Sequence, residues 1–129
     1  MLHHLTLWVP SIERAAGPWG WLLGELGYRP DEAERENVLL FRDGGFAVVL
    51  EQSADMVPGM LHSRLRPGLN HLAFRLPAGV DLADLVLAAT GHGWSALEAS
   101  GHPIAGGAEV AYLEDRDGFE VELVAQPGG

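Results

Sequence analysis

One nine-residue pattern occurs twice in this sequence, as LHHLTLWVP at residues 2–10 and as LNHLAFRLP at residues 69–77. His4 of the first copy aligns with His71 of the second, at the same offset of 67 residues that aligns the two prolines. Both halves then continue alike, with a glycine–aromatic pair and, at the end, an Asp/Gly turn before a strand that carries a carboxylate. Internal repetition of this kind predicts two copies of one structural module.

Periodicity and capping signals predict the same order of elements in both halves. In the first half, Gly17-Pro18 interrupts a helix start at Ser11, so the helix is expected from Pro18 to Leu26. In the second half, Asp81 caps a helix that runs through Ala89. Alternating side chains predict the strands. These are expected at both repeated segments and at 28–30, 37–42, 45–52, 94–98, 109–114 and 118–124.

Each half therefore consists of a strand, a helix and three strands, and the chain is expected to form a single α+β domain over residues 1–129. Its parts are module 1 (1–52), a linker that contains proline and glycine (53–68) and module 2 (69–125). A chain of this length, with 47% hydrophobic residues, has enough apolar side chains for one core.

The composition excludes several chemistries and partners. All eight basic residues are Arg and there is no Cys, which excludes lysine Schiff bases, phosphate-loop lysines, thiol nucleophiles and disulfides. A net charge of −10 without a basic cluster argues against nucleic acids and anionic membranes as partners. The N-terminus lacks the positive region of a signal peptide, and the apolar runs are too short to span a bilayer, so a cytoplasmic location is expected.

The strand pattern separates an apolar face from a polar one in both modules. His4, Glu51, His71 and Glu122 all fall on the face away from the helices. If the two modules form one curved sheet, two imidazoles and two carboxylates converge there, which is a natural ligand set for a divalent cation. The alternative is a salt-bridge cluster without metal, in which Arg75 neutralises Glu51 or Glu122. The apolar, helix-facing set is Leu5, Leu7, Val9, Val48, Leu50, Leu72, Phe74, Leu76, Val121 and Leu123.

Four further residues are candidates for binding a substrate. Thr6, Trp8 and Arg75 share the ligand-bearing face, where Thr6 would hold a polar group, Trp8 would form a wall and Arg75 would bind an anion. His102, in the glycine-rich loop 101–107, would reach the mouth of the pocket. For the first three, ordinary packing or a structural ion pair is the competing interpretation.

The sequence resembles the vicinal oxygen chelate superfamily, which includes glyoxalases, bleomycin-resistance proteins and extradiol dioxygenases. The resemblance lies in His4–Val9, Leu26–Tyr28, Asn70–Phe74 and Leu113–Leu123, where Arg116 replaces the usual proline of an Asp-Pro-Asp-Gly turn. It implies that the two modules form a curved mixed sheet, a cup, with the helices on its outer face.

The resemblance also implies one divalent metal in the cup, held by His4, His71 and Glu122. Glu51 would be the fourth ligand of glyoxalase-type members, although it lies two residues late when 45–46 is aligned with 118–119. The start of the chain is also similar to the fosfomycin-resistance metalloenzymes, which use three protein ligands. No lysine is present here to contact a phosphonate as in that group.

Two functions follow from this resemblance. The first is a metalloenzyme that uses Zn, Ni, Mn or Fe(II) on a small substrate with two adjacent oxygens, with Glu51 as base. It would be a lyase or isomerase, or a dioxygenase if Fe(II) is held by His4, His71 and Glu122 alone. The second is a non-catalytic binder of a drug or metabolite. A homodimer is expected, and the linker would permit exchange of modules between the two chains.

Overall fold

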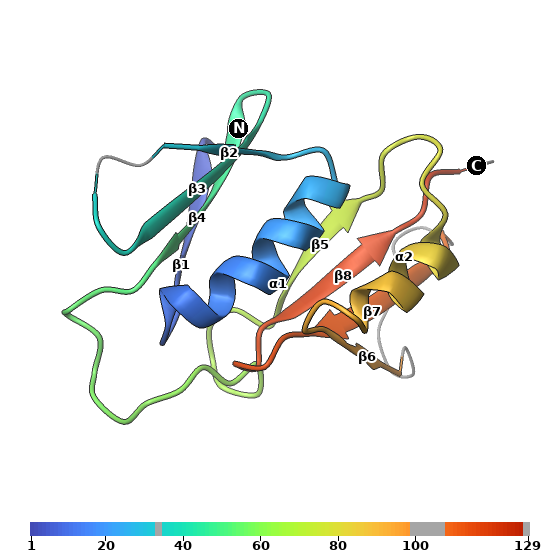
Figure 1. The fold of residues 1–129 in the computed structure, drawn as a ribbon. Helices are drawn as coiled ribbons and strands as arrows, with labels where there is room; N and C mark the ends of the chain where they lie inside the picture. Colours follow the sequence, from blue (N-terminus) through green and yellow to red (C-terminus); the bar gives the residue numbers. More distant parts are fainter. Residues whose placement is uncertain (33–34, 99–107, 128–129) are drawn as a thin grey trace. The chain divides into compact units, whose positions relative to one another are not determined.

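The computed structural model describes residues 1–32, 35–98 and 108–127. The chain forms two compact units, Met1–Leu61 and His62–Gly129, and both contain the same order of elements (Figure 1). The first unit holds β1 (His4–Trp8), α1 (Ile12–Glu25), β2 (Arg29–Asp31), β3 (Val38–Asp43) and β4 (Phe46–Glu51). The second holds β5 (His71–Arg75), α2 (Leu82–Ala89), β6 (Ser95–Leu97), β7 (Val110–Glu114) and β8 (Glu120–Val124).

Each unit is built on one four-stranded mixed sheet. The strand orders are β1-β4-β3-β2 and β5-β8-β7-β6, so the first strand of each unit lies beside the last. These first and last strands are parallel, and the other pairs are antiparallel. The prediction of an α+β fold made of two βαβββ modules is confirmed, and every predicted strand is found within two residues of its expected ends.

The prediction for the first helix was wrong at its N-terminal end. Helix α1 begins at Ile12, so Pro18 lies inside it rather than at its start. The first turn is held by Ser11, whose hydroxyl accepts from the Arg14 amide, and by the Ile12 amide, which donates to Gln52 Oε1 at 2.8 Å. An internal proline costs about 3 kcal/mol. Burial of Ala15, Trp19, Leu22 and Leu23 along the whole helix outweighs that cost, at about 1.5–3 kcal/mol for each large side chain.

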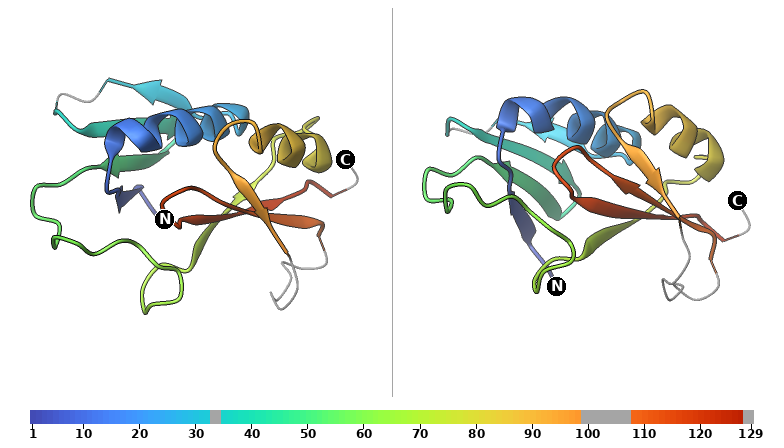
Figure 2. Two further views of the ribbon diagram at one scale, coloured as in Figure 1. Left: turned by 60° about the horizontal axis from the view of Figure 1, so that its bottom comes forward. Right: turned by 90° about the horizontal axis from the view of Figure 1, so that it is seen from below.

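Helix α2 forms as the sequence predicts. Asp81 is its N-cap and accepts from the Asp84 amide at 3.0 Å. The helix lies along one face of its sheet, as α1 does in the other unit (Figure 2). The residues expected to face the helices include the most buried of the chain, such as Val9, Val48, Leu50, Leu76, Val121 and Leu123. Among the described residues, no helix is long and apolar enough to span a membrane.

Candidate functional site

The sheet face away from α2 carries two rows of polar side chains across β5, β8 and β7. In one row His71 pairs with Glu120, which pairs with Glu114. In the next row Ala73 pairs with Glu122, which pairs with Tyr112. Residues in register on neighbouring strands project to the same side of the sheet. The second unit therefore gathers one imidazole, one phenol and three carboxylates on this face.

A tight turn before β8 places its two carboxylates. Asp115 Oδ1 accepts from the backbone amides of Asp117 and Phe119, both at 2.9 Å, and closes the turn. Gly118 has a φ of 90°, a left-handed conformation that favours glycine, and a Cβ there would make a tight contact of 3.2 Å with the His62 carbonyl oxygen. This local geometry starts the strand at Glu120 and sets which side chains of β8 reach the polar face.

His71 lies between the two carboxylates of β8. Its Nε2 is 3.3 Å from Glu122 Oε1, and its Nδ1 is 3.5 Å from Glu120 Oε2. The side chains of Glu120 and Glu122 are only 1% and 7% exposed, whereas that of His71 is 29% exposed. Within the described residues neither Glu120 oxygen has a hydrogen-bond partner. Buried carboxylates cost several kcal/mol of desolvation, so this face is well suited to a cation.

Tyr112 lies against the same carboxylates and makes an edge-to-face contact with the His71 ring at 6.0 Å. Its pKa is raised above the ordinary value, first by burial and then by the neighbouring carboxylates of Glu122 and Glu120. The phenol therefore stays protonated through neutral pH and is a hydrogen-bond donor beside Glu122.

The guanidinium that balances this cluster is Arg64, from the segment between the modules. Its Nη1 bonds Glu114 Oε1 at 2.9 Å, and its Nε is 3.6 Å from Glu120 Oε1. Arg75, which the sequence suggested as the neutralising residue, is exposed on β5. An ionic cluster does exist on this face, but the arginine that the described contacts place in it is Arg64.

The first unit carries a different set at the corresponding positions. His4 pairs with Ala47 and Thr6 with Val49, where the second unit has His71 with Glu120 and Ala73 with Glu122. Glu51 instead pairs with Trp8, four residues along β1 from His4, which is roughly 13 Å at the usual rise per residue. Val49, not Glu51, is thus the counterpart of Glu122.

Both carboxylate oxygens of Glu51 have partners. Trp8 Nε1 donates to Oε1 at 3.1 Å, and Arg35 pairs with Oε2 at 2.7 Å. The Arg35 side chain is 74% exposed. The Glu51 side chain is only 16% exposed, so both of its oxygens are held in a largely buried position.

The structure thus brings together two of the four predicted ligands, His71 and Glu122. His4 and Glu51 belong to the first unit and stand apart along its sheet. Within residues 1–32, 35–98 and 108–127, no group of three or more His, Asp or Glu side chains is arranged to hold a metal ion. Thr6, Trp8 and Arg75 lie exposed on the predicted face of their strands, and His102 lies outside the described residues. The metal site and the substrate-binding roles stay predictions.

Sequence reasoning did not name five residues of the second-unit cluster as site candidates, namely Arg64, Asn70, Glu114, Glu120 and Tyr112. Asn70 had a signal, since it directly precedes His71 in the repeat. Glu114 and Tyr112 alternate along β7 and fall in register with Glu120 and Glu122, which a register assignment between strands would have shown. No sequence pattern indicated that Arg64 belongs to the cluster, because its position depends on the path of an irregular segment.

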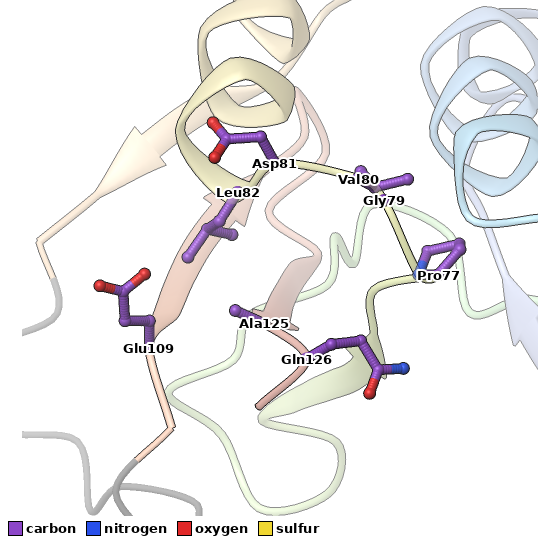
Figure 3. A pocket seen from close by; sticks show the side chains of 8 residues that line it. All are labelled: Pro77, Gly79, Val80, Asp81, Leu82, Glu109, Ala125 and Gln126. Atoms are coloured by element: carbon purple, nitrogen blue, oxygen red, sulfur yellow. The ribbon is translucent and has the colours of Figure 1, made fainter. Parts of the chain in front are cut away.

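One pocket of about 300 Å³ lies at the N-terminal end of α2, and none of the predicted site residues is among those that line it (Figure 3). Its polar groups have structural roles, since Asp81 caps the helix and Gln126 Nε2 donates to the Leu76 carbonyl at 2.9 Å. Most of the other lining residues are apolar, and Glu109 stands at the edge. The pocket therefore carries little chemistry of its own.

Paired βαβββ modules, each with a histidine at the start of its first strand, define a protein of the vicinal oxygen chelate class. Residues 3–112 match the Glyoxalase/Bleomycin resistance protein/Dioxygenase superfamily. The chain belongs to that family.

Three relatives illustrate the likeness. Protein YqjT of Bacillus subtilis (strain 168), which is uncharacterised, is 32% identical over 126 residues, covering 96% of this chain and 98% of that protein. A crystal structure of a candidate glyoxalase from Bacillus halodurans is also 32% identical, with a TM-score of 0.83 over 98% of this chain and 96% of that one. The E126Q mutant of the fosfomycin resistance protein FosX from Listeria monocytogenes, complexed with Mn(II) and 1S,2S-dihydroxypropylphosphonic acid, shares the fold. Its TM-score is 0.66 at 17% identity, covering 96% of this chain and 88% of that one.

Proposed function

We propose that this protein is a glyoxalase-like metalloenzyme that acts on a small substrate with two adjacent oxygens. The observation that carries the proposal is the pair formed by His71 Nε2 and Glu122 Oε1, 3.3 Å apart on the polar face of the second sheet. A nitrogen donor and a buried carboxylate at this separation fit a divalent transition-metal cation such as Zn, Ni, Mn or Fe(II). The Mn(II) complex of FosX, a protein of the same fold, supports a metal in this class of site.

The proposed ligands are His71 and Glu122 from the second unit and His4 from the first. His4 occupies the position in β1 that His71 occupies in β5, which supports an equivalent role. Glu51 is the proposed fourth ligand and general base. Its support is weaker, because its counterpart in the second unit is Val124 and because Arg35 and Trp8 already bind it.

A bound divalent cation would supply Lewis-acid stabilisation of negative charge on the substrate oxygens. The residues of the chain would do the rest. Glu51, once released by Arg35, would take a proton from the substrate, while Arg75 would attract an anionic group and Thr6 would bind a polar one. Trp8, exposed beside Glu51, would contact the substrate carbon skeleton. The proposed reaction is a lyase or isomerase step, or a dioxygenase reaction if the metal is Fe(II).

Elemental analysis of protein purified without chelator tests this proposal. We expect close to one transition metal per chain in the wild type, and strong loss in His71→Ala, His4→Ala and Glu122→Gln. His92→Ala, in an exposed turn, is the matched control and should keep the metal. Wild-type protein without metal, and without a thermal shift on adding Ni, Zn, Mn or Fe(II), would instead support the alternative, a non-catalytic drug- or metabolite-binding protein.

We further propose a homodimer, as is expected of this family. Light scattering at several protein concentrations should give twice the chain mass of 13.9 kDa. A monomer mass at all concentrations would remove this part of the proposal without touching the metal site, because the metal content is measured separately.

A further inference from the structure

Asn70 connects the backbone of the segment before β5 to the ring of His71. Its Nδ2 donates to the backbone carbonyl oxygen of Arg64 at 3.0 Å, and its Oδ1 lies 2.7 Å from His71 Nδ1. Asn70 is itself exposed, so its amide is placed by these two bonds and not by packing. The contact is short enough to be a good hydrogen bond.

The partners of the amide determine which of its atoms faces the histidine. A backbone carbonyl oxygen can only accept a hydrogen bond, so the NH₂ group must point toward Arg64. The amide oxygen is then left facing Nδ1, and it too can only accept. The proton of this bond must therefore come from the ring, which places a hydrogen on His71 Nδ1.

We infer that Asn70 is a positioning residue that fixes His71 in the Nδ1–H form and directs the Nε2 lone pair toward Glu122. The tautomer itself follows from the contacts above; its use in binding a metal rests on the proposed function. An imidazole whose Nδ1–H is held by an acceptor presents Nε2 as the ligand atom in a defined orientation. A lone pair and a carboxylate oxygen 3.3 Å apart repel each other unless a cation or a proton lies between them.

Two further contacts anchor this arrangement to the sheet. The Arg64 guanidinium bonds Glu114 on β7 and lies near Glu120 on β8, so the carbonyl that orients Asn70 belongs to a residue tied to two strands. Glu120 Oε2, at 3.5 Å from Nδ1, also favours a proton on that nitrogen. The Asn70 amide oxygen and the Glu120 carboxylate therefore both favour a proton on Nδ1.

The first unit lacks this device at the corresponding position. His3 stands where Asn70 stands in the repeat, and its Nδ1 lies 2.9 Å from His4 Nδ1. Either imidazole can donate or accept, so this contact does not select one tautomer of His4. His4 therefore serves as an internal comparison for His71.

NMR spectra of the imidazole nitrogens in the metal-free full-length chain test the inference, at alkaline pH where the rings are neutral. We expect wild-type His71 to carry its proton on Nδ1, with the resonances assigned by their loss in His71→Gln. Asn70→Asp keeps an acceptor toward Nδ1 and should keep that form. Asn70→Leu, of similar size but without an acceptor, should move the proton to Nε2 in most of the population, while His4 is unchanged in both variants.

A metal titration of the same proteins gives the second readout. We expect Asn70→Leu to bind Zn or Ni about 10- to 100-fold more weakly than the wild type and Asn70→Asp to be closer to it. A wild-type His71 with its proton on Nε2, or an Asn70→Leu variant that keeps the Nδ1–H form, would overturn the inference. A wild type with the Nδ1–H form but no metal binding would refute the proposed function while the role of Asn70 in fixing the tautomer is supported.

Discussion

The two units have one architecture and differ in what they place on the polar face. Both begin with a strand that starts at a histidine, and both pair that strand in parallel with their last one. In the first unit the residues opposite this strand are Ala47 and Val49; in the second they are Glu120 and Glu122. The same register thus places two apolar side chains opposite the first strand in one module and two buried carboxylates in the other.

This difference indicates that the polar face of the second unit lowers the free energy of unfolding. Apolar residues at these positions pack without desolvating a charge, as the first unit demonstrates. The second unit instead buries two carboxylates and needs Arg64, His71 and Tyr112 to compensate for them. Groups that are costly to fold and that gather around one histidine are characteristic of a functional site rather than of a core.

The largest effect is expected from the same substitution made in both modules. Under the proposed function, Glu122→Gln should weaken binding of Ni or Zn by at least about 100-fold, because it removes the proposed anionic ligand beside His71. Glu51→Gln should weaken it by no more than about 10-fold, because Glu51 lies two positions beyond the counterpart of Glu122 and is already paired. Isothermal titration calorimetry on the metal-free protein measures both affinities.

An equal loss of metal affinity in Glu122→Gln and Glu51→Gln would contradict this prediction and would indicate that Glu51 binds the metal as directly as Glu122 does. Far-ultraviolet circular dichroism and the urea midpoint serve as controls, since both variants should remain folded. Arg35→Gln, which frees Glu51 without removing it, should leave the affinity unchanged or raise it slightly.

A second prediction concerns the buried carboxylate nearest to Arg64. Glu120→Gln should raise the free energy of unfolding of the metal-free protein by about 1 kcal/mol, because it removes a buried charge whose contacts among the described residues are 3.5 and 3.6 Å long. Arg64 keeps its bond to Glu114 at 2.9 Å in this variant. Urea unfolding monitored by tryptophan fluorescence gives the value.

The same variant should bind metal less tightly, by about 10-fold, because a negative charge beside His71 is lost. Higher stability with weaker binding is the expected signature of a residue kept for function. A loss of stability greater than about 1 kcal/mol would show that Glu120 is a structural partner of Arg64 instead.

The helix caps provide a third and smaller comparison. Asp81→Ala should lower the free energy of unfolding by about 1 kcal/mol, since it removes the cap and a favourable charge at the N-terminus of the short helix α2. Ser11→Ala should cost about half as much, because Gln52 and the buried Ala15 also hold the first turn of α1. Urea unfolding of both variants measures the difference, and a larger loss for Ser11→Ala would contradict it.

The sequence was sufficient for the features that depend on repetition and periodicity. The repeat around His4 and His71 predicted the two modules, and strict alternation along the strands predicted which side chains face the helices. These features follow from local pattern because one face of each strand must be buried. The two-residue offset of Glu51 was also evident from aligning the two halves of the sequence.

The features that the sequence did not predict correctly depend on packing between distant segments of the chain. Pro18 indicated a helix start, but the apolar face of α1 on both sides of it outweighs the local preference. Arg64 reaches Glu114 and Glu120 from an irregular segment whose path no periodicity describes. The amide of Asn70 has a role only because the Arg64 carbonyl lies beside it. A sequence pattern predicts on which face of a strand or helix a residue lies. Its contacts with residues from distant segments become known only from the folded structure.

The smallest expected effect concerns His62, which stacks on Phe119 with ring centroids 4.1 Å apart at the start of the second unit. Burial lowers the pKa of His62; the charge of Asp115 raises it in part, and that of Arg66 lowers it further. The unfolded chain has the ordinary histidine pKa of about 6.5. Below that pH the unfolded state takes up a proton that the folded state resists, so stability falls as the pH is lowered from about 6.5 toward the folded-state pKa.

His62→Gln should flatten this part of the stability profile, whereas His92→Gln, at an exposed position of the same unit, should leave it unchanged. Urea midpoints are measured in closely spaced steps between neutral and mildly acidic pH, and the slope of the midpoint against pH is compared between variants. Loss of the ring stack lowers the midpoint by the same amount at every pH, so it does not change this slope. Identical slopes in His62→Gln and the wild type would show that His62 is not what makes the second unit sensitive to acid.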